Sequence, residues 1–64
     1  MTNIIKEKTQ AKSEGLQKSI KRETLSCEEA RNMYLGYLTC LVDLGYISPN
    51  EKKDCMEKFC LETL

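Results

Sequence analysis

Two helix-start signals determine what the second half of this chain can fold into. Ser26 is followed three residues later by Glu29, and Ser48 is followed in the same way by Glu51. In such a capping box the serine side chain accepts from the first helical turn, while the glutamate reaches back to the serine amide. The signals therefore predict two consecutive helices. These helices are expected to span about residues 27–44 and 49–62.

Apolar side chains recur at three- and four-residue spacing in both predicted helices, as they do on the buried stripe of an amphipathic helix. Gly45 follows the first helix at the position where glycine commonly ends one. The chain is therefore predicted to be all-α, with a helical hairpin over residues 25–64. The stripe of the first helix comprises Ala30, Met33, Tyr34, Tyr37, Leu38, Leu41 and Leu44, and that of the second comprises Cys55, Met56, Phe59 and Cys60.

The first part of the chain has a different composition. Residues 1–24 carry six basic and three acidic side chains, whereas residues 25–64 carry four basic and seven acidic ones, so a formal net charge of zero conceals a basic and an acidic segment. Apolar residues are sparse before Leu25, and no helical or strand period is sustained there. Residues 1–24 are therefore predicted to form a flexible basic arm that precedes the hairpin.

The predicted hairpin exposes more apolar surface than two short helices can cover on each other. A core of this size returns less free energy than ordering its residues costs. We therefore expect the hairpin to be oligomeric or to dock on a partner protein. The residues predicted to form this contact are Tyr34, Leu35, Leu38, Val42, Tyr46, Met56 and Phe59.

The four cysteines do not have the spacing of a metal site. Structural zinc sites bring their ligands in close pairs, whereas twelve, fourteen and four residues separate Cys27, Cys40, Cys55 and Cys60. A disulfide framework is the alternative for a secreted chain. Without a signal peptide at its start the chain is expected to be cytoplasmic, with free thiols and with Cys40 facing Cys55 in the core. No metal and no cofactor is predicted.

Catalysis and membrane insertion both lack support in the sequence. The chain contains no histidine, which is the commonest general base, and Glu28 and Glu29 oppose thiolate formation at the neighbouring Cys27. No apolar run approaches the ~20 residues that span a bilayer. The strongest alternative function is a small dimeric DNA-binding regulator, with a helix-turn-helix-like hairpin and the basic arm on the phosphate backbone. The acidic charge of the predicted second helix disfavours this alternative.

Residues 37–59 resemble the short oligomerisation hairpins called SHOCT domains. The resemblance rests on Tyr37-Leu38, on Leu41-Val42-Asp43-Leu44-Gly45, on the turn Tyr46-Ile47-Ser48-Pro49 followed by Asn50-Glu51, and on Lys58-Phe59. In size and style the chain is also similar to very small helical proteins of phages and conjugative elements. Both resemblances imply a non-enzymatic interaction module that self-associates or binds another protein, and the second implies inhibition of a host or defence protein.

Overall fold

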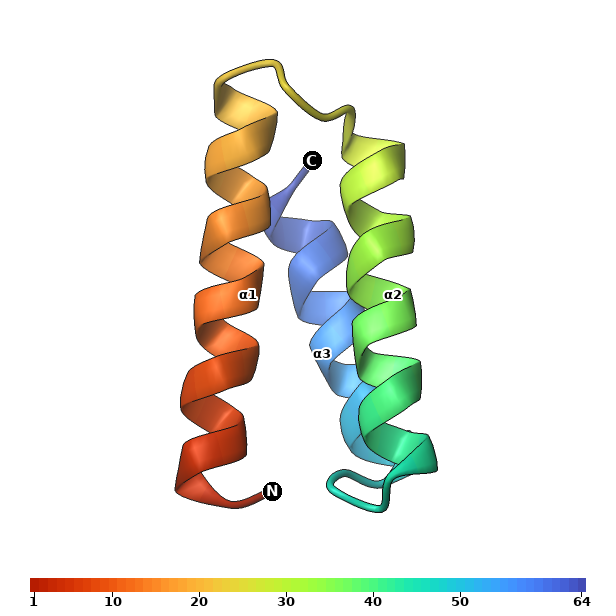
Figure 1. The fold of residues 1–64 in the computed structure, drawn as a ribbon. Coiled ribbons are helices and arrows are strands. Elements are labelled where there is room, and N and C mark those ends of the chain that lie inside the picture. The colour runs from red at the N-terminus through yellow and green to blue at the C-terminus, as the bar shows by residue number, and fades with distance from the viewer.

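The computed structural model describes all residues from Met1 to Leu64 and contains three α-helices and no strands. Helix α1 spans Asn3–Lys21, α2 spans Cys27–Asp43 and α3 spans Pro49–Glu62. The helices run up, down and up, and α3 lies behind the space between α1 and α2 (Figure 1). The bundle measures 33 × 18 × 17 Å. The all-α prediction is confirmed.

Helices α2 and α3 begin where the sequence predicts. Ser26 Oγ accepts from the Glu29 amide at 3.1 Å, and the Glu29 carboxylate accepts from the Ser26 amide at 3.1 Å. At α3 the bonds between Ser48 and Glu51 are 2.9 and 3.1 Å long. Both capping boxes are therefore complete, and they satisfy amide groups that a helix start would otherwise leave unpaired.

Residues 3–21 form helix α1, so the prediction of a flexible arm is wrong. The inward face of α1 repeats at helical spacing, but two of its five members are small polar residues. Thr9 and Ser13 are 4% and 6% exposed, and Leu16 is 5% exposed. Partly buried Ile5 and Ile20 pack against the same core. Because threonine and serine count as polar, this buried face does not stand out as an apolar stripe in the sequence.

The turns that end α1 and α2 have the same backbone hydrogen bonds. At the end of α2, Tyr46 donates to the Leu41 carbonyl at 2.9 Å, and Gly45 has a φ of 81°. At the end of α1, Thr24 donates to the Ser19 carbonyl at 3.0 Å, and Glu23 has a φ of 61°. Each turn is a Schellman motif, which needs one left-handed residue and usually has glycine there. Because Glu23 rather than a glycine occupies this position, the sequence gives no signal for the end of α1.

The core is one cluster to which all three helices contribute. The rings of Tyr34 and Phe59 pack at its centre in a tilted arrangement, with centroids 4.5 Å apart. Helix α2 packs against both other helices, whereas α1 and α3 contact each other far less. This unequal packing leaves the α1–α3 side of the bundle open. The buried apolar residues are Leu16, Ala30, Tyr34, Leu38, Leu41, Ile47 and Phe59.

Candidate functional site

The seven residues predicted to bind a partner differ in exposure and fall into three groups. Tyr34, Leu38 and Phe59 are buried in the core of the bundle, at 3%, 0% and 1% exposure. Val42 and Met56 are partly buried against that core. Leu35 and Tyr46 are 40% and 54% exposed. The structure therefore does not bring the seven together on one surface, and only the last four can contribute to one.

Leu35 and Val42 lie on the edge of α2 that borders α3. Arg31 marks this edge, because its guanidinium donates to the backbone carbonyls of Cys60 at 3.4 Å and Thr63 at 3.5 Å. Leu35 lies one helical turn after Arg31, and Val42 follows Leu35 by a heptad, so the three share one side of the helix. Both apolar side chains therefore flank the α2–α3 seam.

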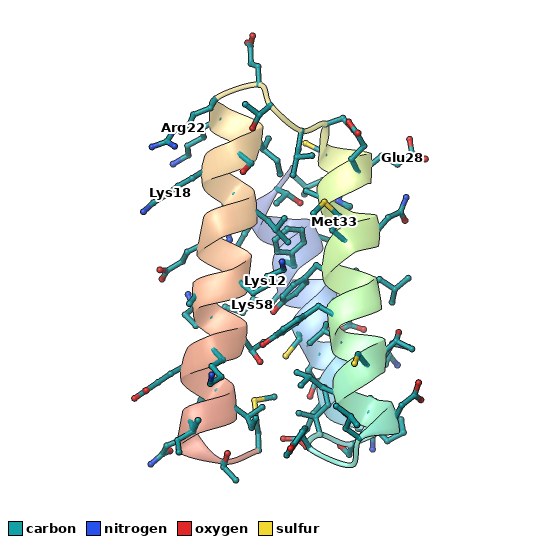
Figure 2. All side chains as sticks on the ribbon, viewed as in Figure 1. Lys12, Lys18, Arg22, Glu28, Met33 and Lys58 are labelled. Carbon is teal, nitrogen blue, oxygen red and sulfur yellow. The ribbon has the colours of Figure 1, made fainter.

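Met33 and Cys40 lie on the opposite edge of α2, which borders α1. Met33 is 48% exposed and lines a hollow of about 300 Å³ between α1 and α2. Its side chain lies in the space between these two helices in Figure 2. Gly36 lies between the two edges, with no atom within 4 Å of where a Cβ would stand. We call Met33, Leu35, Gly36, Thr39, Cys40 and Val42 the outer face of α2.

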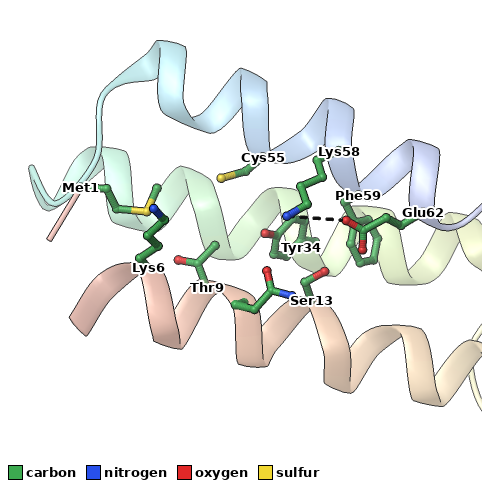
Figure 3. A pocket seen from close by; sticks show the side chains of 10 residues that line it. Met1, Lys6, Thr9, Ser13, Tyr34, Cys55, Lys58, Phe59 and Glu62 are labelled. Carbon is green, nitrogen blue, oxygen red and sulfur yellow. Dashed lines mark ion pairs between the residues drawn. The ribbon is translucent and has the colours of Figure 1, made fainter. Parts of the chain in front are cut away.

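A pocket of about 160 Å³ lies between α1 and α3, at the open side of the bundle. Figure 3 shows Thr9 and Ser13 reaching into it from α1, and Cys55 and Lys58 bordering it from α3. Tyr34 from α2 forms its floor together with Phe59. Sequence reasoning missed this pocket, although the four-residue spacing from Ile5 through Thr9 and Ser13 could have indicated a buried face of α1.

The titratable groups on the floor of the pocket are held in their neutral forms. Burial raises the pKa of the Tyr34 phenol well above its usual range, and the neighbouring Cys55 adds to the rise. Burial also raises the pKa of the Cys55 thiol, partly offset by a hydrogen bond with Tyr34. A neutral thiol is a poor nucleophile. The pocket therefore offers hydrogen-bonding groups and apolar surface rather than an activated nucleophile.

The four cysteines are free thiols and lie in different environments. Cys27 donates to the Thr63 carbonyl at 3.4 Å, which links the start of α2 to the end of α3. Cys40 is exposed, so the expectation that it faces Cys55 in the core is wrong. Cys40 lies outside the core on the edge of α2 that borders α1, and among the four cysteines only Cys55 packs against the core. No three potential ligands among cysteines and acidic residues come together as a metal site would require.

The basic residues of α1 belong to a packed helix. Lys18 and Lys21 lie in its last turn, where positive charge complements the helix dipole. Lys18 and Arg22 point away from the bundle (Figure 2). Lys12 lies over the Tyr37 ring at 5.9 Å, a cation–π contact between α1 and α2. A free basic arm that follows a phosphate backbone is therefore not a feature of this fold.

Comparison with known proteins adds no family to this description. No protein-family model, curated protein or solved structure matches the chain. None of the three helices combines the length and the apolar character that crossing a bilayer requires.

Proposed function

We propose that this chain is a non-enzymatic interaction module that binds a helix of another protein on the outer face of α2. The observation that carries the proposal is the exposure of large apolar side chains along α2 and its following turn. Met33, Leu35 and Tyr46 are 48%, 40% and 54% exposed, although each belongs to or adjoins the best-packed helix. Large apolar side chains that stay exposed on a small protein are typical of a protein-binding surface.

The shape of the outer face suits a helix. Leu35 and Val42 border one side, Met33 and Cys40 border the other, and Gly36 lies between them with open space in front of it. A glycine at the centre of a helical face lets a second helix backbone approach closely. A partner helix could therefore lie along α2 with its apolar side chains on both flanks.

The charges around the outer face favour a different protein over a second copy. Glu28 points outward near the start of α2 (Figure 2), and Asp43 ends the helix. The single basic residue of α2, Arg31, is engaged with α3. Pairing two copies of α2 in either direction brings acidic ends together. A partner helix with basic residues beside its apolar stripe would complement both ends, so self-association is the second form of this proposal.

We also propose that binding modulates the partner protein. The exposed apolar side chains suit binding, whereas the protonated groups of the pocket offer no activated nucleophile for catalysis. Small helical proteins of phages and mobile elements, which this chain resembles in size and style, often act by inhibiting a host protein. Binding on the outer face of α2 would inhibit the partner by covering a helix that the partner needs for another contact.

A pair of matched substitutions tests the outer face. Leu35→Glu places a charge on it, whereas Leu61→Glu makes the same change on α3 at a residue that is 70% exposed. The partner is captured from cells and purified, and its binding to each variant is measured by titration. Leu35→Glu should weaken the binding free energy by about 2 kcal/mol or more, whereas Leu61→Glu should leave it unchanged. Native mass spectrometry of the unaltered protein and of the two variants tests whether the chain self-associates through this face. Equal binding by both variants would contradict the proposal.

A further inference from the structure

The pocket between α1 and α3 contains a buried hydroxyl group without a hydrogen-bond partner. Thr9 is 4% exposed, and its Oγ1 atom is the one buried side-chain oxygen or nitrogen that pairs with nothing. One turn further along, Ser13 Oγ accepts from the Gln17 amide at 3.0 Å. A buried polar atom left unpaired is costly to a fold. The Thr9 hydroxyl is therefore unpaired within the protein, beside the pocket that Thr9 lines.

The positive charge at the pocket is only partly neutralised. Lys58 Nζ lies 3.9 Å from the Glu62 carboxylate, which also accepts from Gln17 Nε2 at 2.6 Å. Lys6, which rises from α1 toward α3 in Figure 3, forms no ion pair. Glu51, which borders a neighbouring hollow with Lys6, is paired with the Met1 amino group at 2.8 Å. The side chains of the lining therefore hold two ammonium groups and one carboxylate, and Met1 adds its amino group, which is paired with Glu51.

The floor of the pocket is aromatic. Tyr34 and Phe59 are 3% and 1% exposed overall, yet both rings line this space. At about 160 Å³ the pocket has room for about five water molecules at ~30 Å³ each, or for an organic group of similar bulk. Apolar walls with a few converging polar groups are the usual features of a small-molecule site.

We propose that this pocket binds a small organic carboxylate. The carboxylate lies between the Lys6 ammonium and the Thr9 hydroxyl, which both donate to it, and the short apolar body of the ligand lies on the Tyr34 and Phe59 rings. Charge-assisted hydrogen bonds from ammonium groups are the stronger kind. The aromatic floor favours a monocarboxylate with an apolar body over phosphate, which needs donors on all sides. The pocket shares no residue with the outer face of α2, so this proposal is independent of the proposed function.

Benzoate is a suitable probe, and benzamide, which has the same ring but no charge, is its matched control. Titration of the ¹⁵N-labelled protein followed by NMR should give saturable shifts with benzoate at the amides of Thr9, Ser13, Tyr34 and Cys55, at about millimolar concentration. Benzamide should bind at least tenfold more weakly. Equal shifts with both compounds, or no saturable shifts with benzoate, would overturn the proposal.

Four substitutions locate the carboxylate. Lys6→Ala should weaken benzoate binding about tenfold, whereas Lys8→Ala, an exposed lysine outside the pocket, should leave it unchanged. Thr9→Val keeps the shape of the side chain and should weaken binding about fivefold, the value of one hydrogen bond. Asp54→Asn removes a carboxylate that borders the hollow beside Lys6, and it should strengthen binding. Unchanged affinity in both Lys6→Ala and Thr9→Val would show that the carboxylate does not lie there.

Discussion

The α2–α3 hairpin and helix α1 are held in the same bundle by different means. In the hairpin, two capping boxes and a glycine turn provide local signals, and the packed rings of Tyr34 and Phe59 provide a large apolar contact. Helix α1 begins at a single hydroxyl cap, where Thr2 Oγ1 accepts from the Ile5 amide at 3.2 Å. Local structure and core packing therefore agree in the hairpin, whereas α1 depends mainly on packing.

This difference explains why the bundle is open on one side. Thr9 and Ser13 are short, so they let α1 lie against Tyr34 but leave space before α3. Larger apolar residues at these two positions would fill that space and improve the packing. The weaker contact of α1 and the presence of a pocket are thus two consequences of the same pair of small polar residues.

Truncation of core residues separates the two regions most strongly. Phe59→Ala should lower the free energy of unfolding by about 3–5 kcal/mol, which is as much as a core of this size supplies. Leu16→Ala on α1 should cost about 2–3 kcal/mol, because Leu16 borders a hollow into which its neighbours can relax. Urea unfolding followed by circular dichroism measures both values.

The exposed Leu61 provides the control for these truncations. Leu61→Ala, at a side chain that is 70% exposed, should change the free energy of unfolding by less than about 0.5 kcal/mol. If Leu16→Ala cost as much as Phe59→Ala, α1 would be as tightly packed as the hairpin, and the contrast between the two regions would not hold.

The sequence predicts the starts of α2 and α3 well because their signals are local. Both starting residues are correct, and α2 ends at Asp43, one residue before the predicted boundary. Helix α1 was not predictable by the same reasoning, since its buried face is polar at Thr9 and Ser13 and its final turn has Glu23 in place of glycine. Packing against the α2–α3 core decides the conformation of this segment, and packing has no local signature.

The same limit of local sequence signals applies to the residues predicted to contact a partner. Tyr34 and Phe59 have the amphipathic spacing of either a core or an interface, and only the arrangement of three helices assigns them to the core. The pocket depends on the distance between α1 and α3, which belong to opposite ends of the chain. The exposure of Leu35 and Tyr46 could be expected from the sequence. The apolar residues in and after the first predicted helix cover more surface than a two-helix hairpin can bury.

Substitutions in the two Schellman turns should change stability by an intermediate amount. Glu23 and Gly45 have the same left-handed backbone, but only glycine adopts it without a penalty. Gly45→Ala should therefore destabilise the fold by about 1 kcal/mol, and Glu23→Gly should stabilise it by up to about 1 kcal/mol. Thermal unfolding of the two variants beside the unaltered protein measures the difference. Two changes of the same sign would mean that the turn of α1 does not have the geometry described.

Acid titration is expected to produce the smallest effect. Hydrogen bonds from Ser26, first of all from its backbone amide, lower the pKa of Glu29. Donation from the Met1 amino group, and then from the Ser48 amide, lowers the pKa of Glu51. A carboxylate whose pKa is lower in the folded protein adds stability that is complete above its unfolded pKa of about 4.3 and is lost as the pH falls through the folded value.

The free energy of unfolding should therefore decline slightly as the pH falls below about 5. Glu29→Gln keeps an acceptor for the Ser26 amide but cannot titrate, so it should flatten part of this decline. Glu57→Gln, at an exposed residue of α3 without a hydrogen bond or ion pair, is the control and should leave the profile unchanged. The start of α1 is capped by the Thr2 hydroxyl, which does not ionise, so this cap should contribute equally at every pH. An acid profile that Glu29→Gln does not alter would show that the capping box of α2 adds no stability through its charge, and the hairpin would then rest on packing as α1 does.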